Sequence, residues 1–199
     1  MSNSKIQGLK LNSSDHTVSQ EIDFDELVDV DLSDEDTLKR EISQAIIDKV
    51  VDRTESGRDS SGASMGKYSE SYKNSLDFKA FGKSDPVDLK LTSDMLTSVD
   101  IVKESGNKVT LGLIGELQNA KAYGHQTGMK GHPFLEGKVK PREWFGMSYE
   151  DIKKDILSNF RGELHAVQKR TVMRERDDTL KAAQDFLRQA LEEDEDDGT

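Results

Sequence analysis

Cysteine is absent from this 199-residue chain, and proline occurs only three times. The absence of cysteine excludes disulfide bonds and cysteine-based metal sites. Hydrophobic residues make up 33% of the sequence and aromatic residues 6%, so the core is expected to be small for the chain length. No stretch approaches the roughly 20 apolar residues of a membrane-spanning helix, and the first residues lead into no apolar run typical of a secretory signal. We therefore expect one compact domain with extensions and no membrane partner.

Negative charge is abundant, and it is concentrated at the two ends of the chain. Residues 1–36 hold ten acidic and two basic residues, and residues 192–197 are six consecutive acids. Residues 37–191 hold 26 basic and 23 acidic residues and are nearly neutral. A nucleic-acid-binding surface requires a basic patch that matches the phosphates, and the sequence has no dense basic run. We expect no specific nucleic-acid binding.

Residues 1 to about 17 are polar and rich in serine and asparagine and predict a mobile arm, which is part of an acidic N-terminal arm expected over residues 1–32. Within this arm Val18, Gln20, Ile22 and Phe24 alternate with polar residues, which predicts a strand that forms against a partner. Two interpretations of the acidic part are open. It is either a solvated linker or a docking arm whose apolar residues insert into a neighbouring subunit.

A helix is predicted over residues 34–53, with Ser33 as its N-cap and three acids in its first turn. Its apolar residues recur at helical spacing: Leu38, Ile42, Ala45, Ile46 and Val50. Residues 54–88 follow as a long loop, which a compact domain rarely contains unless the loop is functional or contacts a partner. The aromatic residues of this loop would be poorly protected in a monomer, so we expect burial of the loop in an assembly.

Residues 97–104 and 108–114 have the alternation of two antiparallel strands, with a turn at residues 105–107. A short helix over 116–126 and an edge strand over 139–145 are predicted next. Ser148 is expected to cap a second helix that runs to residue 160, and Gly162 to interrupt it. A further amphipathic helix over 163–191 precedes an acidic tail over 192–199. The expected fold class is α+β, with a small antiparallel sheet packed by two or three helices within residues 33–162, an extended N-terminal arm and a C-terminal helical extension.

Residues that typically carry chemistry are scattered in this sequence. His125 and His132 lie seven residues apart in a glycine-rich stretch, without the short helical spacing that a histidine metal site requires. The sequence contains no nucleophile elbow and no phosphate-binding loop with Lys-Ser/Thr. We therefore predict no catalytic residues, no metal, no cofactor and no enzymatic activity.

Four motifs in the middle of the chain are more informative. In order, they are Arg53-Thr-Glu-Ser-Gly-Arg58-Asp59, Lys67-Tyr68-Ser69-Glu-Ser-Tyr72, Leu89-Lys-Leu-Thr92-Ser-Asp94-Met95-Leu96 and Val139-Lys-Pro141-Arg142-Glu-Trp144-Phe145-Gly146. Together, and in this order, they resemble the virion morphogenesis proteins of tailed bacteriophages, the tail-completion or neck proteins that join head and tail. The resemblance covers about residues 38 to 160. Family members often carry glycine in place of Ser93 and Phe-Leu-Gly in place of Trp144-Phe145-Gly146.

The resemblance implies a structural virion protein that forms a homo-oligomeric ring at the head–tail junction. Such a ring is a neck connector or a tail terminator, and it joins the DNA-filled head to the tail. The implied partners are portal or adaptor proteins and tail tube or tail terminator proteins, and DNA passes through the ring without specific binding. The implied location is the virion, after assembly in the host cytoplasm.

Seven residues within or beside these motifs are candidates for an assembly interface: Arg53, Arg58, Tyr68, Tyr72, Arg142, Trp144 and Phe145. An arginine fork pairs well with carboxylates, here Glu55, Asp59 or Asp94, either between subunits or within the domain, although an exposed arginine contributes little by itself. Trp144 is either a core residue or an interface anchor. Two other functions are considered: a non-virion scaffolding or adaptor protein that binds partners through its acidic arms, and a hydrolase with an unrecognised site.

Overall fold

The computed structural model describes residues 6–89, 94–130 and 139–196, with side chains described up to residue 188. Three predicted features lie outside the described residues: Thr92 and Ser93 of the third motif, His132, and the last three residues of the acidic tail.

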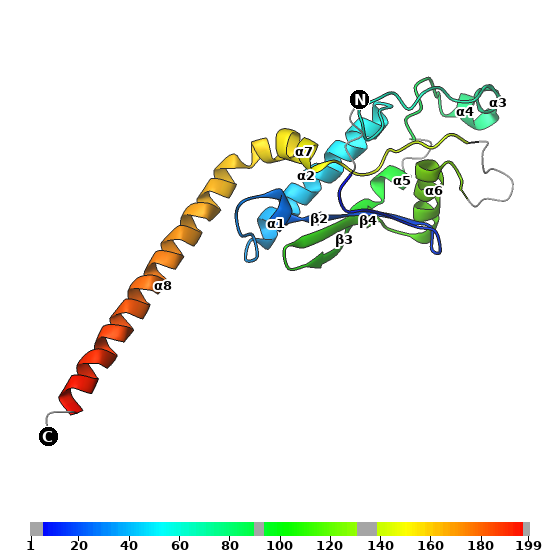
Figure 1. Cartoon of the computed structure of the whole chain (residues 1–199). Helices are drawn as coiled ribbons and strands as arrows, with labels where there is room; N and C mark the ends of the chain where they lie inside the picture. Colours follow the sequence, from blue (N-terminus) through cyan, green and yellow to red (C-terminus); the bar gives the residue numbers. More distant parts are fainter. Residues whose placement is uncertain (1–5, 90–93, 131–138, 197–199) are drawn as a thin grey trace.

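A four-stranded antiparallel sheet is the base of the fold, with strand order β1-β2-β4-β3. Its strands are β1 (Leu9–Asn12), β2 (Thr17–Asp23), β3 (Val99–Ser105) and β4 (Lys108–Leu113). Three helices lie over one face of the sheet: α2 (Asp36–Glu55), α5 (Asp94–Thr97) and α6 (Glu116–Thr127) (Figure 1). A fourth helix, α8 (Arg161–Asp196), extends away from this body. The predicted α+β class, with a small antiparallel sheet and a C-terminal helical extension, is confirmed.

The N-terminal segment is extended, as expected, but the prediction of a mobile arm is wrong. β2 pairs with β4, with Ile22 opposite Val109, so the strand expected to need a partner finds it within the same chain. The short helix α1 (Phe24–Leu27) follows, and Phe24, Leu27 and Leu32 are at most 1% exposed. Burial of these apolar side chains among the acids holds the segment in the fold, at about 1.5–3 kcal/mol for each large side chain.

β3 and β4 form the predicted hairpin. Ser105 lies opposite Lys108, so Gly106 and Asn107 make a two-residue turn with Gly106 at φ +57°. Alternate residues of β4 face the core, as the sequence pattern predicted: Val109, Leu111 and Leu113. The register shifts between Ile101 and Lys103, at the free edge of the sheet. Such an irregularity makes an edge a poor template for a further strand.

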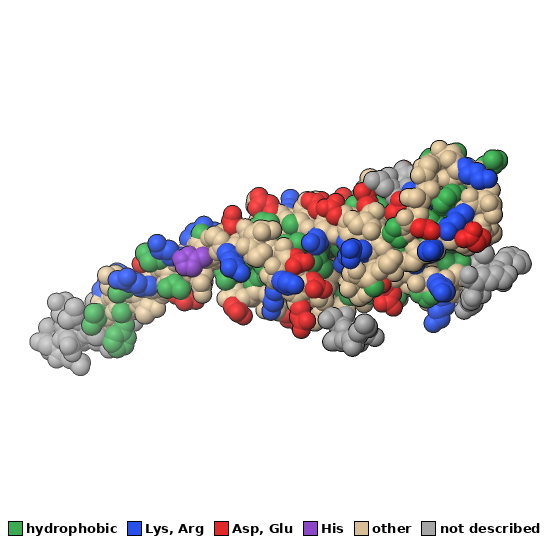
Figure 2. Space-filling model, turned by 90° about the horizontal axis from the view of Figure 1, so that it is seen from above, with side chains coloured by type: hydrophobic (Ala, Val, Ile, Leu, Met, Phe, Trp, Pro, Cys, Tyr) green, Lys and Arg blue, Asp and Glu red, His purple; other side chains and the backbone are tan. Residues whose placement is uncertain are grey.

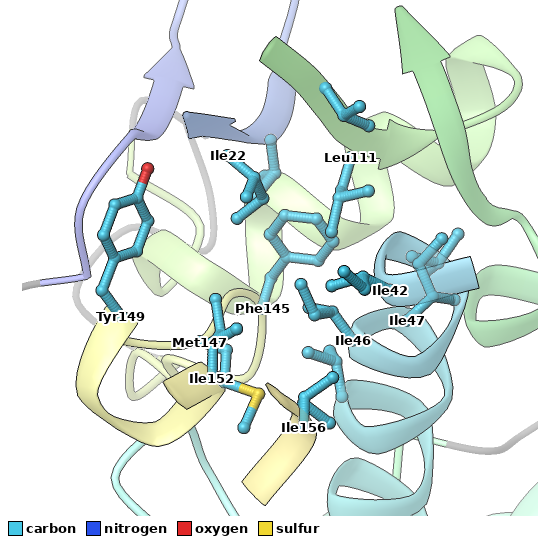
Figure 3. Packing of buried hydrophobic residues seen from close by; sticks show 14 of the residues in the cluster. Ile22, Ile42, Ile46, Ile47, Leu111, Phe145, Met147, Tyr149, Ile152 and Ile156 are labelled. Carbon is cyan, nitrogen blue, oxygen red and sulfur yellow. The ribbon is translucent and has the colours of Figure 1, made fainter. Parts of the chain in front are cut away.

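α2 lies two residues further along the chain than predicted. The Ser33 prediction is wrong, because Glu35 holds the N-cap position and makes no side-chain cap bond. The Ser33 amide instead donates to the Asp31 carboxylate at 2.9 Å, within a turn that precedes the helix. The predicted apolar face is confirmed, and it packs toward the sheet (Figure 3). In that core Phe145 lies among Ile22, Leu111 and the isoleucines of α2.

Residues 56–88 are largely irregular, as predicted for the long loop, although they contain two short helices. These are α3 (Glu70–Lys73) and α4 (Leu76–Ala80), each capped by a serine whose side chain accepts a backbone N–H bond. Met65 and Val87 are buried in the core and anchor the two ends of the stretch. The loop is therefore an ordered part of the fold that is anchored to the core.

The predicted strand over residues 139–145 does not form. Residues 139–148 run as an extended chain without strand pairing. Pro141 has no N–H to give to a ladder, and side chains occupy several backbone groups of the residues that follow.

The C-terminal region begins at Ser148, which caps α7 (Tyr149–Asp151) as predicted by accepting a bond from the Asp151 amide. A π-helical turn (Ile152–Ile156) and a 3-10 turn (Leu157–Asn159) follow. The interruption therefore lies at residues 157–160 and not at Gly162, which is inside α8. Among the described helices, none is long and apolar enough to cross a membrane.

Candidate functional site: the clamped segment and the loop face

The fourth motif ends in residues 144–147, here called the clamped segment, and all four residues are buried. The rings of Trp144 and Phe145 meet edge to face, with centroids 5.4 Å apart. Gly146 has φ +90°, a conformation that side-chain-bearing residues rarely adopt. A Cβ there would also lie 3.0 Å from Ile6 and 3.2 Å from the Gln20 amide oxygen. The turn therefore requires glycine.

Arg53, in the last turn of α2, holds this segment from one side. Its Nη2 donates to the carbonyl oxygen of Trp144 at 2.8 Å and to that of Gly146 at 2.9 Å. Burial lowers the pKa of the guanidinium, while the negative charges of Asp59 and Asp151 act in the opposite direction. A charged donor to a carbonyl gives a stronger hydrogen bond than a neutral one, so Arg53 fixes the end of α2 to the fourth motif.

Gln20, in the middle of β2, holds the segment from the other side and is fully buried. Its Nε2 donates to the Met147 carbonyl at 2.7 Å, and its Oε1 accepts from the Met147 amide at 2.9 Å. The side-chain amide thus satisfies both backbone groups of Met147, as a neighbouring strand would. Gln126, in α6, accepts from the Phe145 amide at 3.1 Å.

These three polar side chains explain why the segment is buried without being a strand. A buried backbone group without a partner is costly, at about 1–3 kcal/mol. Arg53, Gln20 and Gln126 come from three different elements, and each satisfies a backbone group of the clamped segment. The three side chains therefore act by hydrogen bonding to the backbone, and in this way they hold the helices, the sheet and the clamped segment together.

The first motif continues into a tight loop that contacts the fourth motif. The Ser60 amide donates to the Glu143 carbonyl at 2.6 Å. Within the loop, Asp59 accepts from the backbone amides of Ser61 and Ala63 at 2.9 and 3.0 Å. Arg58 is exposed, and its guanidinium donates to the Gly62 carbonyl at 3.1 Å. The first and fourth motifs therefore meet at the surface as well as inside the fold.

The second motif opens a lobe formed by residues 67–88. Three rings lie in mutual contact there, with centroid separations of 5.3–5.5 Å: Tyr68, Tyr72 and Phe78. The Tyr68 hydroxyl donates to Asp88 at 2.7 Å, and partial burial followed by this bond raises the pKa of Tyr68. These three rings are therefore half-buried against one another, whereas Phe81 is exposed, as expected for this loop.

Arg142 and His125 are two neighbouring titratable residues that lie between the motifs described above. The Arg142 amide donates to the His125 carbonyl at 2.8 Å. Burial lowers the pKa of the Arg142 guanidinium, and the nearby Tyr68 hydroxyl opposes that shift. Burial, together with the positive charges of Arg142 and Lys121, lowers the pKa of His125 to about 4. His125 is thus neutral at pH 7.

The structure separates the seven predicted interface residues into two groups. Arg53, Trp144 and Phe145 are within the fold, with Trp144 0% and Phe145 1% exposed, so direct contact of these two rings with a partner is a wrong expectation. Their apolar surface is covered by the core, which leaves the core interpretation of Trp144. Arg53 pairs inside the domain, but with carbonyl groups and not with the carboxylates considered from the sequence.

The second group lies in what we call the loop face, formed by residues 57–88 and 140–143. It contains Arg58, Tyr68, Tyr72 and Arg142. Sequence reasoning missed the two glutamines of the clamp. One signal for Gln20 was present, since it occupies a core-facing position in the apolar alternation of Val18 and Ile22. Gln126 gave no comparable signal.

No group of three or more histidine and acidic side chains suited to a metal ion occurs in the part of the chain that the structure describes. In comparisons with known proteins, no protein-family model, no curated protein and no solved structure matches the chain.

Proposed function

We propose that this protein is a structural component of a tailed-phage virion that forms a homo-oligomeric ring at the head–tail junction, with the loop face as its contact surface. The ring joins the portal or adaptor assembly to the tail tube or tail terminator. Its work is assembly, without chemistry on a substrate.

The observation that carries the proposal is the convergence of the motifs behind the resemblance. Arg53 and Trp144 are 91 residues apart and are joined by a hydrogen bond of 2.8 Å. The second motif lies close to the fourth, near enough for the Tyr68 hydroxyl to act on the Arg142 charge. Three of the four motifs therefore lie close together beside a surface loop, as expected if they serve one contact.

Exposed apolar side chains on the lobe support a contact surface there. Leu76 is 85% exposed and Phe81 54%, although each is in a short, ordered stretch. Two large apolar side chains left exposed on one short lobe are consistent with a contact that is covered in an assembly. The adaptor alternative relied on mobile acidic ends, and it loses support because residues 6–32 are folded into the body.

The test is the mass of the purified protein by light scattering, alone and mixed with the portal and tail-tube assemblies of the same phage. We expect a closed ring alone or on one of these partners. Leu76→Asp combined with Phe81→Asp should abolish the ring while the circular dichroism spectrum stays unchanged. Val102→Asp, another exposed apolar position (46%) at the far edge of the sheet, is the control and should leave the ring intact. Loss of the ring in the control alone, or no ring with either partner, would overturn the proposal.

A further inference from the structure

α8 carries an apolar stripe that no other described part of the chain covers. Five large apolar side chains in this helix are 51–69% exposed: Val172, Met173, Leu180, Phe186 and Leu187. Met173, Leu180 and Leu187 follow one another at seven-residue steps, two helical turns, so they lie along one line within about 20°. Figure 2 shows hydrophobic side chains, in green, uncovered toward the end of the projecting helix.

The stripe faces away from the protein's own body. α8 packs on the body through Val167, which is 4% exposed, and through the ion pairs of Arg170 with Glu35 and Arg174 with Asp34. At 100° per residue, Val167, Arg174 and Arg170 point about 140°, 120° and 80° away from the line through Leu180. The described part of the body therefore lies to one side of the stripe and leaves it open to a second molecule.

The charge along α8 indicates what that molecule is. Residues 161–176 hold five basic and two acidic residues, whereas residues 177–196 hold two basic and eight acidic residues. The helix is positive near the body and negative at its far end. A second copy laid antiparallel brings the acidic far end of each helix next to the basic near end of the other. A parallel copy would set the acids beside acids.

We propose that α8 is a self-association helix, and that the stripe through Met173, Leu180 and Leu187 pairs with the same stripe of a second copy in antiparallel orientation. About 22 residues of α8 lie beyond Arg174, which gives about 33 Å of helix. Isolated helices of this kind gain most of their stability from packing of an apolar face. The antiparallel pair supplies that packing and keeps the two bodies at opposite ends.

This inference does not rest on the proposed ring. A two-fold pair closes on two copies, whereas a ring needs a head-to-tail contact elsewhere on the molecule. The α8 stripe and the loop face are separate surfaces, so each proposal can fail without the other.

Two adjacent alanines offer a matched test by mass-resolved scattering on the full chain. Ala183 lies about 60° from the Leu180 line and Ala182 about 160° from it, and both are exposed. Ala183→Glu should halve the mass of the particle, to 22.3 kDa if the starting particle is a pair, while Ala182→Glu should leave it unchanged. Equal masses for the two variants would overturn the proposal.

Because the chain has no cysteine, single-cysteine variants test the orientation directly. Met173→Cys and Leu187→Cys chains carrying different tags are mixed and treated with a short bis-maleimide. The antiparallel pair predicts a link between the two tags and little linkage of Met173→Cys chains to each other. Efficient linkage of Met173→Cys chains to each other, or no link between the tags, would contradict the pair, whatever the ring experiment shows.

Discussion

α2 and α8 are the longest helices that the structure describes, and they use their apolar residues differently. α2 has 20 residues and buries eight of them against the sheet and the segments packed beside it. α8 has 36 residues, and within its described side chains only Val167 is buried. Both helices have apolar residues at helical spacing. Helical periodicity of apolar residues therefore predicts that a helix has a face to be covered, whereas the position of the helix in the fold decides which molecule covers that face.

This contrast has energetic consequences, because a change in the body costs folding energy whereas the same change in the free part of α8 does not. A buried residue of the body and a matched exposed residue should therefore respond differently to the same kind of substitution.

Trp144→Ala should have the largest effect. It removes a fully buried indole and should lower the free energy of unfolding by about 3–5 kcal/mol. Leu187→Ala, measured in the Ala183→Glu background where α8 is unpaired, should change it by less than about 0.5 kcal/mol. The free energy of unfolding of both variants is measured by urea denaturation, with far-UV circular dichroism as a signal that does not depend on the tryptophan. A similar loss of stability in the two variants would contradict this difference between the body and α8.

Arg53→Met should come next, because it leaves two buried carbonyl groups without their donor. We expect a loss of about 1.5–3 kcal/mol. Arg58→Met, an exposed arginine of the same motif, should stay within about 0.5 kcal/mol of the natural chain. If Arg58→Met destabilised the protein as much as Arg53→Met, the clamp would not be the source of the stability.

One substitution, glycine to alanine, should have opposite signs in the two regions. Gly146→Ala places a side chain at φ +90° and should cost about 1–3 kcal/mol. Gly162→Ala lies inside α8 with nothing near its added Cβ, and it should stabilise the helix by about 0.5–1 kcal/mol. The thermal midpoints of the two variants should therefore move in opposite directions, and a shift in the same direction would argue against this assignment.

His125→Gln should have the smallest effect at neutral pH, because both side chains are then uncharged, and its effect depends on pH. The pKa of His125 is about 4 in the folded protein and near 6.5 in the unfolded chain, so the unfolded state binds the proton first as pH falls. The contribution of the neutral His125 to the free energy of unfolding is therefore fully present above pH 6.5 and is lost as the pH falls from 6.5 to 4. His125→Gln should flatten that part of the pH profile. His165→Gln, exposed on α8, should leave it unchanged, and a flat natural profile would refute the prediction.

Regular elements with a clear alternation could be predicted from the sequence. The β3–β4 hairpin follows from Val109, Leu111 and Leu113 and from the turn at Gly106. The interior of α2 follows from its isoleucine spacing. β1 was missed because Leu9 and Leu11 are its whole apolar signal, and the pairing of the predicted strand β2 within the chain was missed because the acids around Phe24 and Leu27 suggested a solvated segment.

The clamp could not be predicted, because its parts are polar and far apart in the sequence. Gln20 and Met147 are separated by 127 residues, and only the folded topology brings them together. The motifs indicated that Arg53 and Trp144 matter, but not that they bind each other. The sequence motifs therefore identified the residues, whereas only the structure shows which of them contact each other.

The central claim is ring formation through the loop face, and the most direct measurement separates it from pairing through α8. It is the particle mass, by light scattering, of the Ala183→Glu variant mixed with the portal or tail-tube assembly of the same phage. The account predicts a closed ring of this variant on one of the two assemblies, and its loss when Leu76→Asp and Phe81→Asp are added. A variant that stays monomeric beside both assemblies would contradict the account.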